Sequence, residues 1–158
     1  MPITAGQGVD LLRKFGDIAQ WAIPVFALGY ANGKGLSSES KQFLVTAAVQ
    51  QIAIDSIKYL THIRRPNGKS LDSFPSGHAT AAFFGAGFYL AVSQTEENQF
   101  RKTTIRTTLF FLAALTGLSR YLSKRHWTCD VVFGACMGTC FGYFAGTNGF
   151  GLFSSKKS

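Results

Sequence analysis

The stretch from Ser119 to Asp130 carries residue types that could perform phosphoryl transfer. His126 and Asp130 are four positions apart, so they would share one face of a helix. The aspartate can then accept the proton-bearing ring nitrogen of the histidine, which leaves the other nitrogen free to attack phosphorus. Arg120 adds a planar, permanently charged guanidinium that suits phosphoryl oxygens. A nucleophile, a residue that orients it and an anion-binding group therefore lie within one short segment.

Two further blocks of polar residues lie upstream of this segment. Lys58 is followed seven positions later by Arg65–Pro66, and the sequence PSGH at Pro75–His78 opens the next apolar run. A lone histidine with an aspartate one turn away is more often a surface or capping pair than a catalytic one. A basic loop alone is typical of a segment that faces solvent or lipid headgroups. The three blocks together favour a phosphate site over both of these interpretations.

In this order and spacing the blocks resemble the type 2 phosphatidic acid phosphatase superfamily, whose pattern is K-x6-RP, PSGH and SR-x5-H-x3-D. The resemblance runs from Lys58 to Asp130, and every fixed position of the pattern is met. It implies the membrane lipid phosphate phosphatase branch and an enzyme that hydrolyses a phosphoric monoester or a lipid pyrophosphate. It also implies that the enzyme uses no metal ion and no cofactor.

The resemblance assigns a role to each site residue. His126 would attack phosphorus and form a phosphohistidine, with Asp130 orienting its ring. His78 would protonate the leaving oxygen and then activate water. The backbone amides at 76 and 77 would lie at a helix start, where unpaired donors favour an anion. The predicted phosphate-binding residues are Lys58, Arg65, Ser76, Gly77 and Arg120.

The composition is consistent with one domain that has an acidic partner. The chain has 158 residues, of which 46% are apolar, and its 16 Lys and Arg outnumber its 8 Asp and Glu to give a net charge of +8. A chain of this length has room for a single core. The cations form short clusters between apolar runs rather than one charged face, which argues against nucleic acid as the partner. An anionic lipid surface or a phosphorylated substrate is the better prediction.

Hydrophobic patterning predicts an all-α fold, a membrane-embedded bundle of about five short transmembrane helices. The runs from Ser73 to Thr95 and from Val131 to Ser155 contain no charged residue. At ~1.5 Å per residue each is long enough to cross a ~30 Å hydrocarbon core. Residues 1–14 are predicted to be a polar, non-helical segment. The helices are expected near residues 15–33, 41–60, 75–94, 103–119 and 128–148.

With five helices that alternate in direction, the loop after Lys58 and the loop after Arg120 fall on the same side of the bundle, as one active site requires. The last helix carries a glycine at every fourth position, and four glycines would each weaken a soluble helix by about 1 kcal/mol relative to alanine. In a bilayer such a face lets another helix approach closely. The four glycines are Gly134, Gly138, Gly142 and Gly146.

The three cysteines, Cys129, Cys136 and Cys140, lack the CxxC spacing of a metal site. We expect them to pack as small residues in an apolar helix.

The resemblance further implies an integral protein of the bacterial inner membrane whose site faces the periplasm, with Lys156–Lys157 on the cytoplasmic side. The substrate could be phosphatidylglycerol phosphate, phosphatidic acid, undecaprenyl pyrophosphate or the 1-phosphate of lipid A. Two alternatives stay open: a soluble acid phosphatase of the same superfamily, and a non-enzymatic membrane protein that binds phospholipid headgroups. The sequence does not indicate an oligomeric state.

Overall fold

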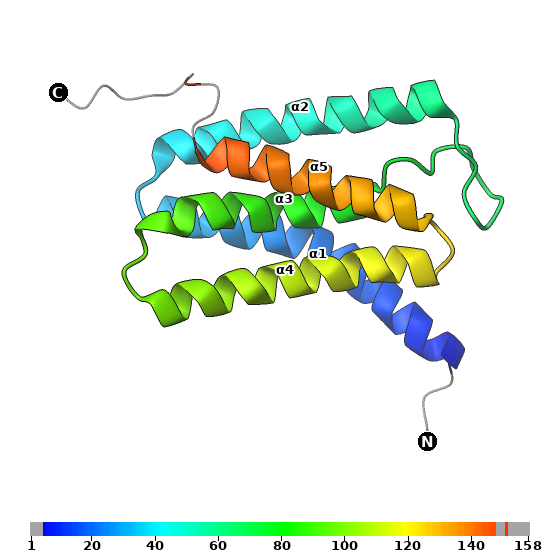
Figure 1. The fold of residues 1–158 in the computed structure, drawn as a ribbon, viewed down its shortest axis with the longest axis horizontal. Helices are drawn as coiled ribbons and strands as arrows, with labels where there is room; N and C mark the ends of the chain where they lie inside the picture. Colours follow the sequence, from blue (N-terminus) through cyan, green and yellow to red (C-terminus); the bar gives the residue numbers. More distant parts are fainter. Residues whose placement is uncertain (1–4, 148–150, 152–158) are drawn as a thin grey trace.

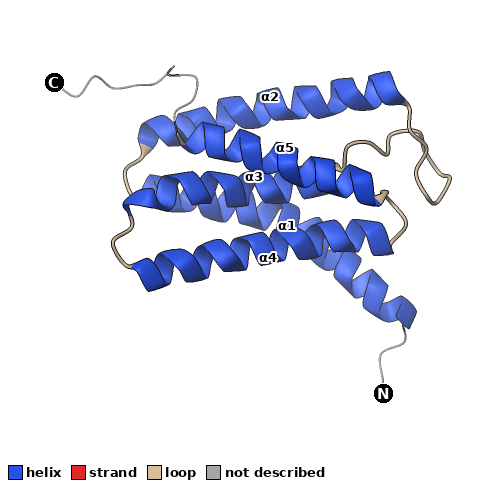
Figure 2. Cartoon of the chain, in the orientation of Figure 1, coloured by secondary structure: helices blue, strands red, loops and turns tan. Residues whose placement is uncertain are grey.

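The computed structural model describes residues 5–147 and residue 151, and within these residues the chain is helical and has no strand (Figures 1 and 2). The all-α prediction is therefore confirmed. The predicted cytoplasmic Lys156–Lys157 lies outside the described residues. The elements are α1 (Ala5–Gly33), α2 (Ser37–Thr61), α3 (Gly77–Val92), the 3₁₀ helix η1 (Ser93–Thr95), α4 (Gln99–Leu122) and α5 (Thr128–Gly146).

Helix α3 lies at the centre of the bundle. It contacts α1, α4 and α5, and α2 packs mainly against α5 (Figure 1). The α2–α3 loop and the α4–α5 loop meet at one end, where Asn67 N donates to Lys124 O at 3.1 Å. The prediction that the two motif loops share a side of the bundle is confirmed.

Helix α1 begins at Ala5, so the prediction of a non-helical segment up to residue 14 is wrong. Asp10 pairs with Arg13 and Lys14, three and four positions along, at 2.5 and 3.3 Å. Such pairs support a helix turn and outweigh its polar composition. Pro24 lies within α1 without ending it.

Helix α3 is shorter than predicted. Its 16 residues span about 24 Å, which is less than a hydrocarbon core. The charge-free run is longer than the helix because Ser73 and Phe74 lie in the preceding loop and Ser93–Thr95 form η1. Most residues of α3 are buried by its neighbours. Helices α2 and α4 begin earlier than predicted, at Ser37 and Gln99, and α4 continues to Leu122.

The glycine face of α5 packs directly on the backbone of α3, as the sequence predicts. A Cβ added at Gly134 would lie 2.8 Å from Ser76 O. Added Cβ atoms at Gly138 and Gly142 would lie still closer to the carbonyl oxygens of Thr80 and Phe84. No side chain larger than hydrogen is compatible with this separation of the two helices.

The cysteines do not pack in the bundle. Cys129, Cys136 and Cys140 are free and exposed. The prediction that they fill space between helices is wrong, because the glycines take the inward face of α5 and turn the cysteines outward.

Among the described helices, α5 is the one that is both long and apolar enough to cross a membrane by itself. The other four described helices, α1 to α4, do not meet the same criterion of length and hydropathy.

Replacing Gly138 by alanine is expected to destabilise the protein by about 1–3 kcal/mol, because the new methyl group meets the backbone of α3. The measurement is the thermal unfolding midpoint in detergent. Gly29→Ala is the matched control, since a Cβ at Gly29 in α1 meets nothing within 4 Å. That control should keep or gain up to about 1 kcal/mol. Equal midpoints for the two variants would contradict the packing described here.

Candidate active site

His126 lies just before α5 and is buried, with 3% of its surface exposed. Its Nδ1 is 2.6 Å from the carbonyl oxygen of Ser73. Because a carbonyl can only accept, Nδ1 carries the proton and Nε2 keeps its lone pair. Burial lowers the pKa of His126 to about 4, so the ring is neutral at pH 7. The structure therefore presents an uncharged imidazole in a single tautomer, the form that can act as a nucleophile.

Asp130 supports His126 in a different way from the predicted one. Its Oδ2 is 3.6 Å from His126 Nδ1, which is too long for a hydrogen bond. The carboxylate instead accepts from Ser73 Oγ at 2.5 Å and from Trp127 N at 2.8 Å. The prediction of a direct hydrogen bond is wrong. Asp130 fixes Ser73, and the carbonyl of Ser73 orients the histidine.

The start of α3 supplies donors for an anion, though not all of the predicted ones. Ser76 N donates to Asp130 O at 3.1 Å, so this amide is already used. Gly77 is the first residue of α3, and a first-turn amide has no acceptor within its helix. The hydroxyl of Ser76 is fully buried and has no hydrogen-bond partner in the described part of the chain. A buried, unpaired hydroxyl is costly unless a ligand completes it.

Two predicted phosphate-binding cations lie close to His126. The charges of Arg65 and Lys58 both act on its ring and favour the neutral form. Arg65 is held by Asp72, with Nη2 donating to Oδ2 at 2.8 Å. Burial opposes ionisation of Asp72, but a hydrogen bond from Ser70 and attraction to Arg65 and Lys58 outweigh it and lower the pKa of this carboxyl. The positive charges of Arg65 and Lys58 therefore act on the imidazole of His126.

The remaining two predicted residues, His78 and Arg120, converge on Asp17 of α1. His78 Nε2 is 3.1 Å from Asp17 Oδ1, and Arg120 Nη1 donates to the same oxygen at 2.8 Å. Arg120 Nη2 also donates to Arg13 O at 2.5 Å. The Arg120 side chain is completely buried, whereas Asp17 is 41% exposed. Asp17 therefore joins the second histidine to the motif arginine.

Asp17 and Ser73 are functional-site residues that the sequence motifs do not include. Asp17 was visible as a charge at the edge of an apolar run, and a charge in such a place often faces a functional interior. The glycine before it leaves room for the arginine, because a Cβ at Gly16 would lie 2.7 Å from Arg120 Nη2. Ser73 gave no signal, since its main contribution to His126 is a backbone carbonyl.

A cavity of about 460 Å³ reaches His126 from the surface and is lined also by Trp127 and Lys124. In the described part of the chain, no group of three or more His, Cys, Asp and Glu side chains is placed to hold a metal ion.

Comparison with known proteins agrees with this geometry. The family model of the PAP2 superfamily matches residues 52–148, a segment that holds all eight predicted site residues. The chain belongs to the PAP2 superfamily. A Porphyromonas gingivalis protein named lipid A 1-phosphatase is 30% identical over 128 residues, which cover 76% of this chain. The chain spans 27% of the length of that relative.

The fold also matches that of a solved structure. The crystal structure of LpxE from Aquifex aeolicus superposes with a TM-score of 0.64 at 19% identity. The match covers 87% of this chain and 84% of that one. Asp17 lies outside the segment that the PAP2 family model matches, so its contact with His78 and Arg120 comes from the structure alone.

Replacing Asp17 by asparagine is expected to destabilise the protein, because the buried guanidinium of Arg120 loses its carboxylate. Breaking a fully buried pair costs about 3–5 kcal/mol, and the partial exposure of Asp17 reduces the expected loss to about 1–3 kcal/mol. The measurement is the unfolding midpoint in detergent. Asp10→Asn on the same helix removes only exposed ion pairs and should lower the midpoint far less. An Asp17 variant as stable as the Asp10 variant would show that Arg120 does not depend on this carboxylate.

Proposed function

We propose that this chain is a metal-independent phosphatase that hydrolyses the phosphate of a membrane lipid through a phosphohistidine intermediate. The observation that carries the proposal is the buried, neutral imidazole of His126, held in one tautomer by Ser73 O. A nitrogen fixed in orientation and freed of its proton needs little reorganisation before attack. Arg65 and Lys58 beside it supply charge for phosphoryl oxygens.

In the first step Nε2 of His126 attacks phosphorus, so a P–N bond forms while the P–O bond to the lipid breaks. His78 donates a proton to the departing oxygen. The negative charge on the phosphoryl oxygens is balanced by Lys58, Arg65 and Arg120. The hydroxyl of Ser76 and the amide of Gly77 complete the oxygen contacts at the start of α3.

In the second step a water molecule attacks the phosphohistidine. His78 takes a proton from this water, the P–N bond breaks, and inorganic phosphate leaves with His126 again neutral. Asp17 holds His78 in both steps, and Asp130 holds Ser73, whose carbonyl keeps the nucleophile in place. Both carboxylates are positioning residues in this mechanism.

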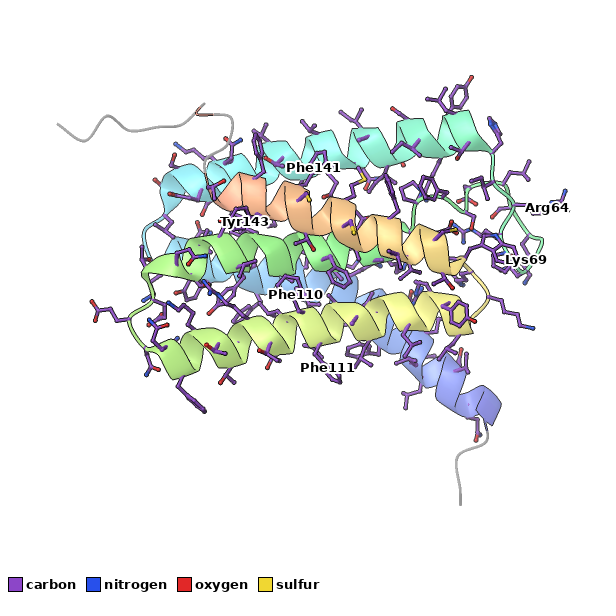
Figure 3. The ribbon with its side chains drawn as sticks, in the orientation of Figure 1. Arg64, Lys69, Phe110, Phe111, Phe141 and Tyr143 are labelled. Carbon is purple, nitrogen blue, oxygen red and sulfur yellow. The ribbon has the colours of Figure 1, made fainter. Side chains whose placement is uncertain are left out.

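The outer surface of the bundle supports a membrane location. Large apolar side chains are exposed on the outward faces of the helices, for example Trp21 at 69%, Ile52 at 66% and Phe111 at 61%. Phe111 points away from the neighbouring helices (Figure 3). Many large apolar side chains exposed on several helices are unusual on a protein surrounded by water and normal on one surrounded by lipid. We place the protein in the bacterial inner membrane with its site at the periplasmic headgroup layer.

An apolar groove of about 370 Å³ between α1 and α4 supports a lipid as the substrate. Phe15 and Ile18 line one end of it, at the same level of α1 as Asp17. An acyl chain lying there would stay out of water, which is worth about 0.8 kcal/mol per CH₂. The name of the Porphyromonas gingivalis relative favours the 1-phosphate of lipid A among the four substrates considered.

The test is phosphate release from the four lipids in detergent micelles that contain excess EDTA. We expect wild-type turnover of at least one lipid and inhibition by orthovanadate, which can adopt the five-coordinate shape of the transition state. His126→Ala should lower kcat by at least about 10³-fold, as expected when a nucleophile is removed. His62→Asn is the matched control. His62 is an exposed histidine at a positive φ of 46°, a conformation that asparagine tolerates, and its ring packs on Tyr59. Its backbone amide caps α2 by donating to Lys58 O at 3.2 Å, a hydrogen bond that asparagine keeps.

Three outcomes would overturn the proposal: full activity in the His126 variant, loss of activity in EDTA, or binding of these lipids without phosphate release. The last outcome would instead support a protein that binds phospholipid headgroups without hydrolysing them.

A further inference from the structure

A second, strongly basic cavity borders the candidate active site. Its volume is about 590 Å³, and it lies between the first turns of α1, the α2–α3 loop and the α4–α5 loop. Lys69, which lines it, lies at the end of the bundle that carries both motif loops (Figure 3). The charged residues that line it are Asp10, Arg13, Arg65, Lys69, Lys124 and Arg125.

Three of these cations have no acidic partner. Arg13 is paired with Asp10 and Arg65 with Asp72. Among the described residues, the side chains of Lys69, Lys124 and Arg125 form no ion pair. Like charges that share one concave surface raise the local potential and attract an anion.

The cavity is built rather than formed by mobile surface lysines. Asn67 N donates to Lys124 O at 3.1 Å, and Trp127 Nε1 donates to Arg64 O at 2.9 Å, so the two loops are tied together. Lys124 has a φ of +53°, an uncommon conformation for a residue other than glycine. Its own amide donates to Tyr121 O at 2.9 Å, which holds that conformation in place.

The cavity and the reaction site share residues. Lys124 and Leu122 line both this cavity and the cavity that reaches His126, and the motif residue Arg65 lines this cavity as well. A ligand held by Lys69, Lys124 and Arg125 would therefore lie next to a phosphate bound at His126. The two anionic groups would be close enough to belong to one headgroup.

We propose that this cavity binds a second anionic group of the same substrate molecule. The inference rests on the proposed phosphatase function and makes its substrate class narrower: lipid phosphates whose headgroup carries at least one further phosphate or carboxylate. The phosphate at His126 is cleaved, and the group in the basic cavity is kept. Lys69, Lys124 and Arg125 are then specificity-determining residues.

The experiment compares a bisphosphorylated glycolipid with its monophosphorylated counterpart. Dissociation constants are measured in neutral detergent micelles with the His126→Ala protein, so that no turnover occurs, and kcat/KM is measured with His126 intact. The bisphosphorylated lipid should bind at least about tenfold more tightly, since one hydrogen bond to a charged group is worth that factor. The triple substitution Lys69→Gln, Lys124→Asn, Arg125→Gln should reduce the preference to about twofold or less.

The charge-matched control replaces three cations at the opposite end of the bundle, Lys34→Gln, Lys41→Gln and Arg101→Gln, and should keep the preference. No preference in the parent protein, or an unchanged preference in the cavity variant, would overturn the inference. Histidine-dependent phosphate release in that case would leave the proposed function intact. Binding preference without any phosphate release would instead contradict the proposed function and retain the cavity as an anion site.

One further arm separates the substrate from neighbouring lipids. Micelles with the monophosphorylated lipid are supplemented with phosphatidylglycerol. If the cavity substitutions weaken binding only when this anionic lipid is present, the cavity binds bilayer headgroups and the inference is wrong.

Discussion

The close approach of α5 to α3 is the constraint on which the site depends. Three glycines let the two backbones pack with only hydrogen atoms between them. At this separation the Ser76 amide reaches the carbonyl oxygen of Asp130, and the Ser73 hydroxyl reaches its carboxylate. The PSGH block and the histidine–aspartate block are therefore joined by hydrogen bonds rather than by proximity alone. The contact between α3 and α5 therefore determines both the packing of these helices and the orientation of His126.

Charge is distributed between two groups of side chains at this end of the bundle. One group surrounds His126 and contains Lys58 and Arg65. The other joins His78, Arg120 and Asp17, and it depends on α1, which supplies both a carboxylate and a backbone carbonyl to the buried guanidinium. Helix α1 thus forms part of the candidate site although it lies outside the matched PAP2 segment. Its first turns also form one wall of the basic cavity.

Much of the architecture could be predicted from sequence because it follows from local patterns. The five helices follow from the apolar runs, the shared side of the two motif loops from helix parity, and the glycine face from a four-residue period. The early start of α1 could not be read from its polar composition, because ion pairs between neighbouring turns stabilise it. The outward cysteines could not be placed until the packing face of α5 was known.

The candidate site residues also differ in how far local sequence patterns predict them and how far they depend on tertiary contacts. All eight motif residues could be named from their spacing, yet the bonding around His126 could not. The orienting acceptor is a backbone carbonyl, which any residue at position 73 would provide. Asp17 is 103 positions from Arg120, so only the folded bundle brings the two together. A direct aspartate–histidine bond is the natural prediction from four-residue spacing, and here the helix start redirects that carboxylate to Ser73 and Trp127.

The central claim is that Nε2 of His126 becomes covalently bonded to phosphorus. The most direct measurement is rapid acid-free quenching of the enzyme during turnover of a ³²P-labelled lipid phosphate, followed by peptide mapping. The account predicts label on His126 that is stable to base and lost in acid, as expected for a phosphoramidate. The label should be absent from His126→Ala. In His78→Ala it should both form and disappear more slowly, because His78 serves in both steps. Turnover without any labelled protein, or label on a different residue, would contradict the account.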